Sequence, residues 1–365
     1  MESRGGGGRM NAARRVTRIF AGAGQWVSGG TRHPGGLFRR VPDDGPWEPL
    51  TAGLPENVEA RAFAVHPREH DVLYVGTQDG PYRTTDGGAR WEQLGFPDRG
   101  AVVWSLAFHP TRPEVMYAGV APIGIYRSED GGDTWRRLPG ARSPGHCEMG
   151  FPARVTRIVA DPGRPDDVYA ALEVSGVIRS ADGGETWTDL SAPLIRLADA
   201  PHLKSRIGSD IDAEGMLDSH AFAVSAAAPG TAFLAVRMGL FRSDDRGVSW
   251  RDVEIGRFSP LTYCRDVIVA PHDGRVMYAC LSVAARGNNG SLYRSDDLGN
   301  TWRRFDHGVT ARGTMMAVAA HPRDPACVYC ASRCGQVFGT EDTGATWREY
   351  PLPAGVEDVY AVACA

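Results

Sequence analysis

Short apolar runs separated by turn residues recur along the chain, and one unit shows the pattern clearly. It reads "WSLAFHP" (104–110), "VMYAGV" (115–120), "GIYRSED" (124–130) and "TWRRL" (134–138). Each run has the length of a β-strand, and Gly, Pro or Asp residues separate each pair. The pattern predicts four short strands per unit and almost no helix.

The unit repeats along the whole chain, with a tryptophan near the end of each copy. Near-copies of "RSEDGGDTW" are "RTTDGGARW", "RSADGGETW", "RSDDRGVSW", "RSDDLGNTW" and "GTEDTGATW", and "GLFRRVPDDGPW" is a degenerate copy. The marker residues are Trp47, Trp91, Trp135, Trp187, Trp250, Trp302 and Trp347, at intervals of 44, 44, 52, 63, 52 and 45 residues. Four strands in a repeat of this length are typical of a β-propeller blade. The sequence therefore predicts an all-β fold, a seven-bladed β-propeller of four-stranded antiparallel blades.

The two ends of the sequence complete one blade between them. "TRIFAGAG" (17–24), "GGLFRR" (35–40) and "PWEPL" (46–50) match the second, third and fourth strands of a unit, but no first strand precedes them. "EDVYAVACA" (357–365) matches the first-strand pattern of "EARAFAVHP" (59–67). We therefore expect the C-terminal strand to join the N-terminal blade and close the ring, which removes exposed sheet edges. Residues 16–365 then form a single propeller, and residues 1–15 are expected to form a flexible tail.

Composition and charge narrow the classes of partner. The chain of 365 residues is 42% hydrophobic and 23% charged, with a formal net charge of −4. This balance provides no global basic field for a phosphate backbone, so we expect no nucleic-acid partner. No apolar run approaches the ~18 residues of a membrane helix, and the Gly-rich N-terminus lacks an apolar core of signal-peptide length. We expect a cytoplasmic protein with no membrane association.

The seven cysteines fit a reducing compartment. They are odd in number and lack the spacing of a disulfide framework. Cys327, Cys330 and Cys334 are close in sequence, but a strand would point Cys327 and Cys330 to opposite faces. We therefore do not favour zinc there.

The repeated motif S/T-x-D-x-G-x-T-W resembles the Asp-box, or bacterial neuraminidase repeat, of sialidase-like propellers. Other propellers that carry it include xyloglucan-cleaving glycosidases, sortilin-type receptors and photosystem II assembly factors, so the resemblance implies a fold more than a function. Sialidases have six blades and an Arg-Ile-Pro motif that is absent here. The seven-bladed count is closer to xyloglucanase halves and assembly factors.

The repeated aspartates are interpreted as turn residues. A feature present six times is rarely one active site, and a side chain such as that of Asp130 can accept hydrogen bonds from its own turn while Gly132 takes a positive φ. The equivalent residues are Asp86, Asp182, Asp245, Asp297 and Asp342. His66, His109 and His321 each precede a proline at the end of a first strand and are also interpreted as turn residues.

Candidate chemistry lies where the chain departs from its repeat. The connections at 139–154 and 191–220 are longer than the others, and the second is expected to be structureless. Long structureless connections in compact domains are often functional. Alignment of the first strands places one set of residues at a common level near the channel mouth, namely Arg61, Trp104, Thr156, His220, Arg265, Met316 and Tyr360. Two positions upstream, and so on the same side of each strand, are Glu59, Val102, Arg154, Asp218, Tyr263, Thr314 and Asp358.

These positions predict a ligand site with acid–base groups at the channel mouth. His220 with Asp218 or Asp358 is the preferred acid/base candidate, because a carboxylate holds the tautomer of a neighbouring histidine. Glu59 and Tyr360 are further catalytic candidates. Arg61, Arg154 and Arg265 are the preferred anion clamp, with Tyr263 and Trp104 as ligand-binding residues. Charged residues that only line a wet channel are the structural alternative.

A transition metal is the alternative cofactor, although the sequence requires none. His33, His146, His202, His220 and His307 map to the ligand face, but only His220 occupies a first-strand position. If a metal is bound, His146, Cys147 and His220 are the first candidates for its ligands.

Two functional interpretations follow. The first is a cytoplasmic hydrolase or lyase, glycosidase-like, that acts on a polar or anionic small molecule or glycan. The second is a non-catalytic propeller whose loop face binds a partner protein or ligand, as assembly factors and receptors of the family do. The long connections and the clustered His, Glu and Arg residues favour the first interpretation.

Overall fold

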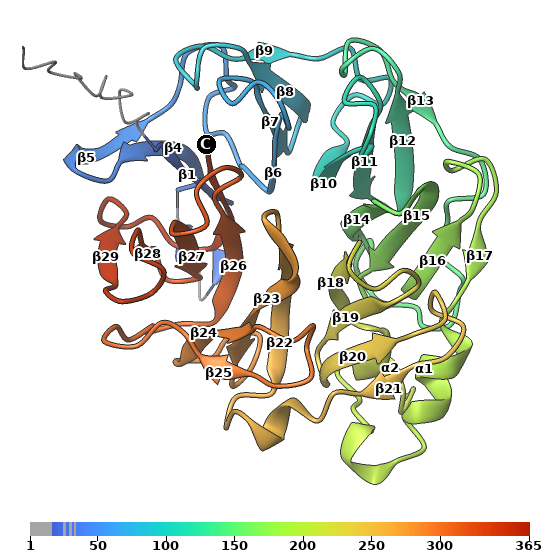
Figure 1. Ribbon diagram of the computed structural model, residues 1–365. Helices are drawn as coiled ribbons and strands as arrows, with labels where there is room; N and C mark the ends of the chain where they lie inside the picture. The colour runs from blue at the N-terminus through green and yellow to red at the C-terminus, as the bar shows by residue number, and fades with distance from the viewer. Residues whose placement is uncertain (1–16, 25–26, 29–30, 33) are drawn as a thin grey trace, which may run out of the picture.

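The computed structural model describes residues 17–24, 27–28, 31–32 and 34–365. The tail predicted at 1–15, and His33 among the metal candidates, lie outside the described residues. The described chain forms a ring of sheets around a central channel (Figure 1).

Seven four-stranded antiparallel sheets confirm the predicted β-propeller. Six of the blades follow one another along the chain, and the first two consist of β6 (Ala62–Val65), β7 (Leu73–Thr77), β8 (Gly80–Thr84) and β9 (Glu92–Gln93), and of β10 (Val102–Phe108), β11 (Met116–Ala121), β12 (Gly124–Ser128) and β13 (Arg136–Arg137). The next two consist of β14 (Val155–Asp161), β15 (Arg164–Leu172), β16 (Gly176–Ser180) and β17 (Thr188–Asp189), and of β18 (Ser219–Val224), β19 (Ala232–Val236), β20 (Gly239–Ser243) and β21 (Arg251–Asp252). The last two consist of β22 (Tyr263–Ala270), β23 (Asp273–Ser282), β24 (Gly290–Ser295) and β25 (Arg303–Arg304), and of β26 (Met315–Ala320), β27 (Val328–Ser332), β28 (Gln336–Thr340) and β29 (Arg348–Pro351).

The seventh blade is built from both ends of the chain, as predicted. Its strand order is β30 (Val359–Cys364), β1 (Ile19–Ala23), β4 (Gly36–Val41) and β5 (Asp44–Pro49). β30 pairs antiparallel with β1, with Ile19 opposite Cys364 and Ala21 opposite Val362. A small hairpin of β2 (Val27–Ser28) and β3 (Thr31–Arg32) lies between β1 and β4 in sequence.

The hydrophobic core is divided among the seven interfaces between neighbouring blades. Each of seven buried clusters combines residues of two adjacent sheets. Trp135, for example, packs with Tyr74 and Leu94 of the preceding blade. The alternation of apolar residues along each strand thus covers both faces of most sheets, because each sheet has a neighbour on either side.

The repeated aspartates are turn residues, as predicted. Asp130 Oδ1 accepts hydrogen bonds from the Ser128 hydroxyl at 2.8 Å and from the Thr134 N–H at 2.9 Å. The Ser128 hydroxyl oxygen accepts the Gly132 N–H at 2.8 Å, and Gly132 has φ +92°. The same Oδ1 contact to the N–H four residues later recurs at Asp86, Asp182, Asp245, Asp297 and Asp342.

The His-Pro histidines also cap turns. His109 Nδ1 accepts the backbone N–H of Arg112 at 3.1 Å, and His66 and His321 make the equivalent contacts to Glu69 and Asp324. Burial lowers the pKa of all three imidazoles, which favours the neutral, accepting form.

The long connection before β18 is folded, and the expectation of a structureless loop is corrected. It contains α1 (Ala192–Leu197), the 3₁₀ turn η1 (Pro201–Leu203) and α2 (Glu214–Leu217). Leu194, Leu203 and Met216 are buried in the cluster between the blades of β14–β17 and β18–β21. These apolar residues are the physical reason for the order, since they extend a blade interface. A second 3₁₀ turn, η2 (Ile255–Arg257), precedes β22. Among the described residues, no helix is long and apolar enough to cross a membrane.

Candidate functional site

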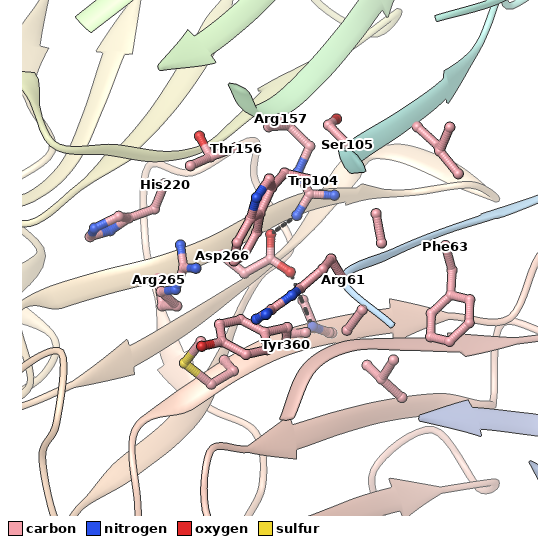
Figure 2. A pocket seen from close by; sticks show the side chains of 17 residues that line it. Arg61, Phe63, Trp104, Ser105, Thr156, Arg157, His220, Arg265, Asp266 and Tyr360 are labelled. Carbon is pink, nitrogen blue, oxygen red and sulfur yellow. Dashed lines mark hydrogen bonds and ion pairs between the residues drawn. The ribbon is translucent and has the colours of Figure 1, made fainter. Parts of the chain in front are cut away.

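The seven residues that the first-strand alignment places at one level lie around one cavity of about 90 Å³ in the channel. Each blade contributes one of them: Arg61, Trp104, Thr156, His220, Arg265, Met316 and Tyr360. Figure 2 shows Arg61, Trp104, His220, Arg265 and Tyr360 converging there from different strands. The repeat alone therefore locates the centre of the channel.

On one side of this cavity, four side chains form an arginine–aromatic stack, namely Tyr360, Arg61, Trp104 and Arg154. The guanidinium carbon of Arg61 lies 4.5 Å from the ring centres of both Trp104 and Tyr360. The guanidinium carbon of Arg154 lies 3.9 Å from the centre of the Trp104 ring. Such contacts hold cations against aromatic faces and fix the side chains.

The stack engages residues that the sequence assigned to ligand binding and catalysis. Arg61 forms an ion pair with Glu59, and its side chain is only 8% exposed. Its guanidinium is thus occupied by Glu59 and two aromatic rings. The roles predicted for Arg61, Glu59, Trp104 and Tyr360 toward a ligand stay predictions, and the structure shows these side chains in contact with one another.

A larger cavity of about 330 Å³ opens on the other side of the mouth. Arg154, Asp218, His220, Tyr263, Arg265 and Tyr360 line it, and these are six of the ten predicted catalytic and ligand-binding residues. Both irregular connections also contribute, through Met149 and Phe151 from one and Ile207 and Glu214 from the other. We call this space the mouth cavity.

His220 is held on both sides at the start of β18. Its Nδ1 is 2.7 Å from the carbonyl oxygen of Cys264 and must donate to it. Its Nε2 is 3.3 Å from Asp218 Oδ2 and 3.2 Å from the Tyr263 hydroxyl. Of the two carboxylates predicted to accompany His220, the structure therefore places Asp218 beside it.

The carboxyl of Asp218 stays ionised in this environment. Burial pushes its pKa upward, but His220, Arg237 and Arg265 together outweigh that effect and leave the pKa below the usual value for aspartate. Burial raises the pKa of the neighbouring Tyr263 to about 12, so its hydroxyl keeps its proton. The cluster thus combines a carboxylate with a protonated phenol.

The pKa of Glu173 is shifted in the opposite direction from that of Asp218. It lies in the β15–β16 connection, lines the mouth cavity and forms an ion pair with Arg154. Burial raises its pKa above the usual value, more than Arg154 lowers it. Burial also lowers the pKa of Arg154. The mouth cavity is therefore lined by two carboxyl groups whose surroundings move their pKa values apart.

Positively charged side chains outnumber carboxyl groups in the lining of the mouth cavity. Five arginines line it against three carboxyl groups, those of Glu173, Glu214 and Asp218. Asp358 does not accompany His220, because it lies 2.8 Å from Arg333 Nε. Arg265 makes no hydrogen bond or ion pair at contact distance within the part of the chain that the structure describes. Its half-buried guanidinium lines both cavities and is available to an anion.

Below the mouth, one ion pair crosses the channel. Arg157 Nη2 of β14 lies 2.5 Å from Asp266 Oδ1 of β22, although the blade of β18–β21 stands between these two blades in sequence (Figure 2). Asp266 Oδ2 also accepts the Val318 N–H of β26 at 3.1 Å. These two contacts of Asp266 connect three blades at the wall of the smaller cavity, the one lined by the seven first-strand residues.

The metal alternative finds no support in the arrangement of its candidates. His146 Nε2 lies 2.6 Å from Asp189 Oδ2, next to outer strand β17, and Cys147 Sγ lies 3.4 Å from the Ser209 hydroxyl. Within residues 17–24, 27–28, 31–32 and 34–365, no group of three His, Cys, Asp or Glu side chains could hold an ion. His146, Cys147 and His220 thus do not form a ligand set, because His146 and Cys147 each contact a different partner.

Sequence reasoning missed the residues that second-to-third-strand connections bring to the mouth. These are Glu173, Arg237, Arg286 and Arg333. The signal was present, since each lies one to four residues beyond the end of a second strand. The alignment compared first strands alone, so it did not reach them.

Comparison with known proteins relates the chain to xyloglucanases. Xyloglucanase Xgh74A of Acetivibrio thermocellus is 27% identical in an alignment 311 residues long, which covers 74% of this chain and 34% of that enzyme. An oligoxyloglucan-reducing end-specific xyloglucanase of Emericella nidulans is 24% identical in an alignment 214 residues long, which covers 49% of this chain and 25% of that enzyme. The chain spans about a third or less of the length of these curated relatives. No protein-family model matches it.

Solved structures share the propeller fold. The GH74 xyloglucanase from Xanthomonas campestris superposes with a TM-score of 0.61 at 19% identity, covering 82% of this chain and 46% of that one. YCF48 from Cyanidioschyzon merolae superposes with a TM-score of 0.58 at 16% identity, covering 87% of this chain and 92% of that one. A further structure, of YCF48 bound to D1 peptide, has a TM-score of 0.53 at 16% identity and covers 87% of this chain and 90% of that one.

Proposed function

We propose that the protein is a glycosidase-like hydrolase that acts at the mouth cavity on a polar or anionic glycan or small glycoside. One observation carries the proposal: Glu173 and Asp218 line the same cavity, and their surroundings move the two pKa values in opposite directions. Pairs of carboxyl groups tuned apart in this way supply an acid and a base at one pH. The xyloglucanase relatives support a glycan as the substrate.

The roles follow from the directions of the two pKa shifts. Glu173, whose pKa burial raises, would act as the acid and donate a proton to the leaving oxygen as the glycosidic carbon–oxygen bond breaks. Asp218, ionised, would accept a proton from the attacking water, whose oxygen forms the new bond to the sugar carbon. Proton exchange with solvent then restores both groups. Glu173 thus takes the acid role that was predicted for His220.

His220 is a positioning residue in this proposal. Both of its ring nitrogens are engaged, one by the Cys264 carbonyl and the other by Asp218 and Tyr263. The imidazole therefore fixes the carboxylate of Asp218 at the cavity wall. Arg265 would bind an anionic group of the substrate, because its guanidinium faces the same cavity.

The test is a reducing-sugar assay on neutral and acidic oligosaccharides with the wild type, Glu173→Gln and the matched control Glu56→Gln. Glu56 is an exposed carboxyl away from the mouth cavity. We expect Glu173→Gln to lower turnover by roughly 10²- to 10⁴-fold, the usual contribution of a general acid. Its affinity for substrate should stay close to that of the wild type, and Glu56→Gln should behave as the wild type. Unchanged turnover in Glu173→Gln would refute the assignment.

A non-catalytic binding role is the second candidate, and one observation favours it. Five arginines line the mouth cavity against three carboxyl groups. A propeller with such a mouth would bind an anionic ligand or a peptide segment without turnover. Ligand affinity that depends on Arg265, combined with no hydrolysis of any oligosaccharide, would establish this function instead.

We also propose the Asp-box assignment and a cytoplasmic location. The six equivalent turns support the first, because each pairs a hydroxyl with a carboxylate and a backbone N–H four residues later. The second is supported by the seven cysteines, all of which lie in the described residues as free thiols. Fractionation of the source cells with thiol labelling tests the location.

A further inference from the structure

Exposed apolar side chains gather around the mouth cavity. In the part of the chain that the structure describes, four large hydrophobic residues are exposed, namely Phe151, Ile207, Val248 and Val283. Phe151, 45% exposed, and Ile207, 42% exposed, line the mouth cavity. Val283 lies in the β23–β24 connection, which also supplies Ala285 and Arg286 to the cavity. Of these four residues, only Val248 lies far in sequence from the residues that line the cavity; it belongs to the turn of Asp245.

The two irregular connections meet to form this apolar wall. Met149 of the first connection contacts Gly208 of the second so closely that a Cβ at Gly208 would lie 2.9 Å from Met149 Cε. Ile207 is next to Gly208, and Phe151 is two residues from Met149. We call Met149, Phe151 and Ile207 the apolar rim.

A buried carboxylate holds the rim in place. Glu214 is fully buried at the start of α2, and its oxygens accept the N–H groups of Ile207 at 2.8 Å and Gly208 at 2.9 Å. They also accept the N–H of Ser209 at 2.9 Å and its hydroxyl at 2.8 Å. Four charge-assisted hydrogen bonds thus fix a loop that carries the exposed Ile207. An apolar side chain held rigidly at a cavity wall is pre-ordered for contact with a ligand.

The rest of the cavity has the opposite character. Arg237, Arg265 and Arg333 line it together with Asp218 and Glu173. A wholly polar ligand would leave the apolar rim in water, and a wholly apolar ligand would bury the Arg265 guanidinium without a partner. Both mismatches disappear for a ligand that carries one group of each kind.

We propose that the ligand is an amphiphilic anion, with an aromatic or aliphatic group that packs against Phe151 and Ile207 and an anionic group that contacts Arg265. For the hydrolase proposed above, the substrate class is an aryl or alkyl glycoside of an acidic sugar. Only this statement about the substrate rests on the proposed function. Binding of the amphiphilic anion does not depend on turnover.

The experiment uses 8-anilinonaphthalene-1-sulfonate, which joins an aromatic group to a sulfonate, as a fluorescent probe of the folded full-length protein. We expect the wild type to bind one equivalent of the dye. Phe151→Ala and Ile207→Ser should each weaken binding by roughly 10-fold through lost apolar contact. Arg265→Gln should weaken it similarly, and the weakening should shrink at high salt. Val248→Ser is the matched control, since it removes an even more exposed hydrophobic residue elsewhere.

Each result of the titration bears on the proposal. Circular dichroism and thermal melting of every variant establish that the fold is intact. No saturable dye binding by the wild type, or affinity unchanged in Phe151→Ala and Ile207→Ser, would overturn the inference. A dimer detected by sedimentation, with dye binding that falls as the protein concentration rises, would also overturn it by showing that a second copy covers the rim. Dye binding that depends on Phe151, Ile207 and Arg265, combined with no hydrolysis by the wild type or with unchanged turnover in Glu173→Gln, would refute only the hydrolase proposal, so the two failures are distinguishable.

Discussion

Arg154 and Glu173 form a partly buried ion pair at the wall of the mouth cavity, and Arg154 also stacks on Trp104. Burial raises the pKa of Glu173 and lowers the pKa of Arg154. Each group is therefore pushed toward its neutral form, while their mutual attraction opposes that shift. The raised pKa of Glu173 is the property that the proposed reaction needs.

The first prediction concerns the pH dependence of turnover. Activity should fall as pH rises through the raised pKa of Glu173, because the acid form is then lost. Arg154→Met removes the positive charge that favours the carboxylate, so the pKa should rise further and the falling limb should move upward by roughly 1 pH unit or more. Profiles of kcat/KM against pH measure this shift. Arg142→Met is the control, because Arg142 is exposed and lies in the same connection, 139–154, as Arg154. A limb that stays in place or moves to lower pH would show that another group sets it.

The centre of the channel was predictable from the sequence, but the acid was not. A repeat fixes equivalent positions, so aligned first strands identify Arg265 and His220 without any structure. Glu173 belongs to the β15–β16 connection, which an alignment of first strands does not include, and only its burial beside Arg154 gives it a distinctive pKa. The position of Arg61 was also predictable, but its engagement with Glu59, Trp104 and Tyr360 depends on rotamers that periodicity does not specify.

The second prediction concerns Asp218 and stability. Its pKa in the folded protein is below the usual value of ~3.9. The ionised carboxylate therefore contributes stability that is present above the unfolded pKa and is lost as pH falls through the folded pKa. Asp218→Asn should lower the free energy of unfolding by about 1–3 kcal/mol at pH 7.

Urea titrations at pH 7 and pH 3 test this dependence. The difference between the wild type and Asp218→Asn should shrink at the lower pH, which lies below the unfolded pKa of ~3.9. Tyr263→Phe is the control, since it removes a hydroxyl from the same cluster without changing a charge in this pH range. An equal difference at both pH values would mean that the ionised form of Asp218 does not carry the stabilisation.

The third prediction concerns the ion pair across the channel. Asp266 is 3% exposed and Arg157 is 36% exposed, so the carboxylate is the partner that depends on the pair. Arg157→Met leaves that buried charge with only the Val267 and Val318 N–H groups and should cost about 1–3 kcal/mol. The double variant with Asp266→Asn should recover part of the loss, giving a coupling energy of about 0.5–3 kcal/mol in a denaturation cycle. Additive costs would indicate that the two side chains act independently.

The fourth prediction separates the repeated turn from the site. Asp130→Ala removes acceptors for the Ser128 hydroxyl and for the N–H and hydroxyl of Thr134. We expect a loss of about 1–2 kcal/mol in unfolding free energy, the range of a few partly exposed hydrogen bonds, and no change in ligand affinity or turnover. Thermal melting and a binding titration on the same preparation measure both. Loss of activity at native stability would contradict the assignment of Asp130 as a turn residue.

The last prediction concerns the closing strand. Removal of residues 358–365 eliminates β30, which is the inner strand of its blade and pairs with β1 from Ile19 to Ala23. Val359 and Val362 are buried in the cluster shared with the blade of β26–β29, and Ala363 is buried in the cluster shared with the blade of β6–β9. The truncation thus damages two interfaces at once, and each buried valine alone contributes about 1.5–3 kcal/mol. Because domains have only about 5–15 kcal/mol of net stability, the truncated chain should be largely unfolded at 37 °C. Calorimetry measures the loss, and a synthetic peptide of residues 356–365 should restore part of the melting temperature by pairing with β1. A truncated protein that melts at the wild-type temperature would show that the ring does not depend on β30.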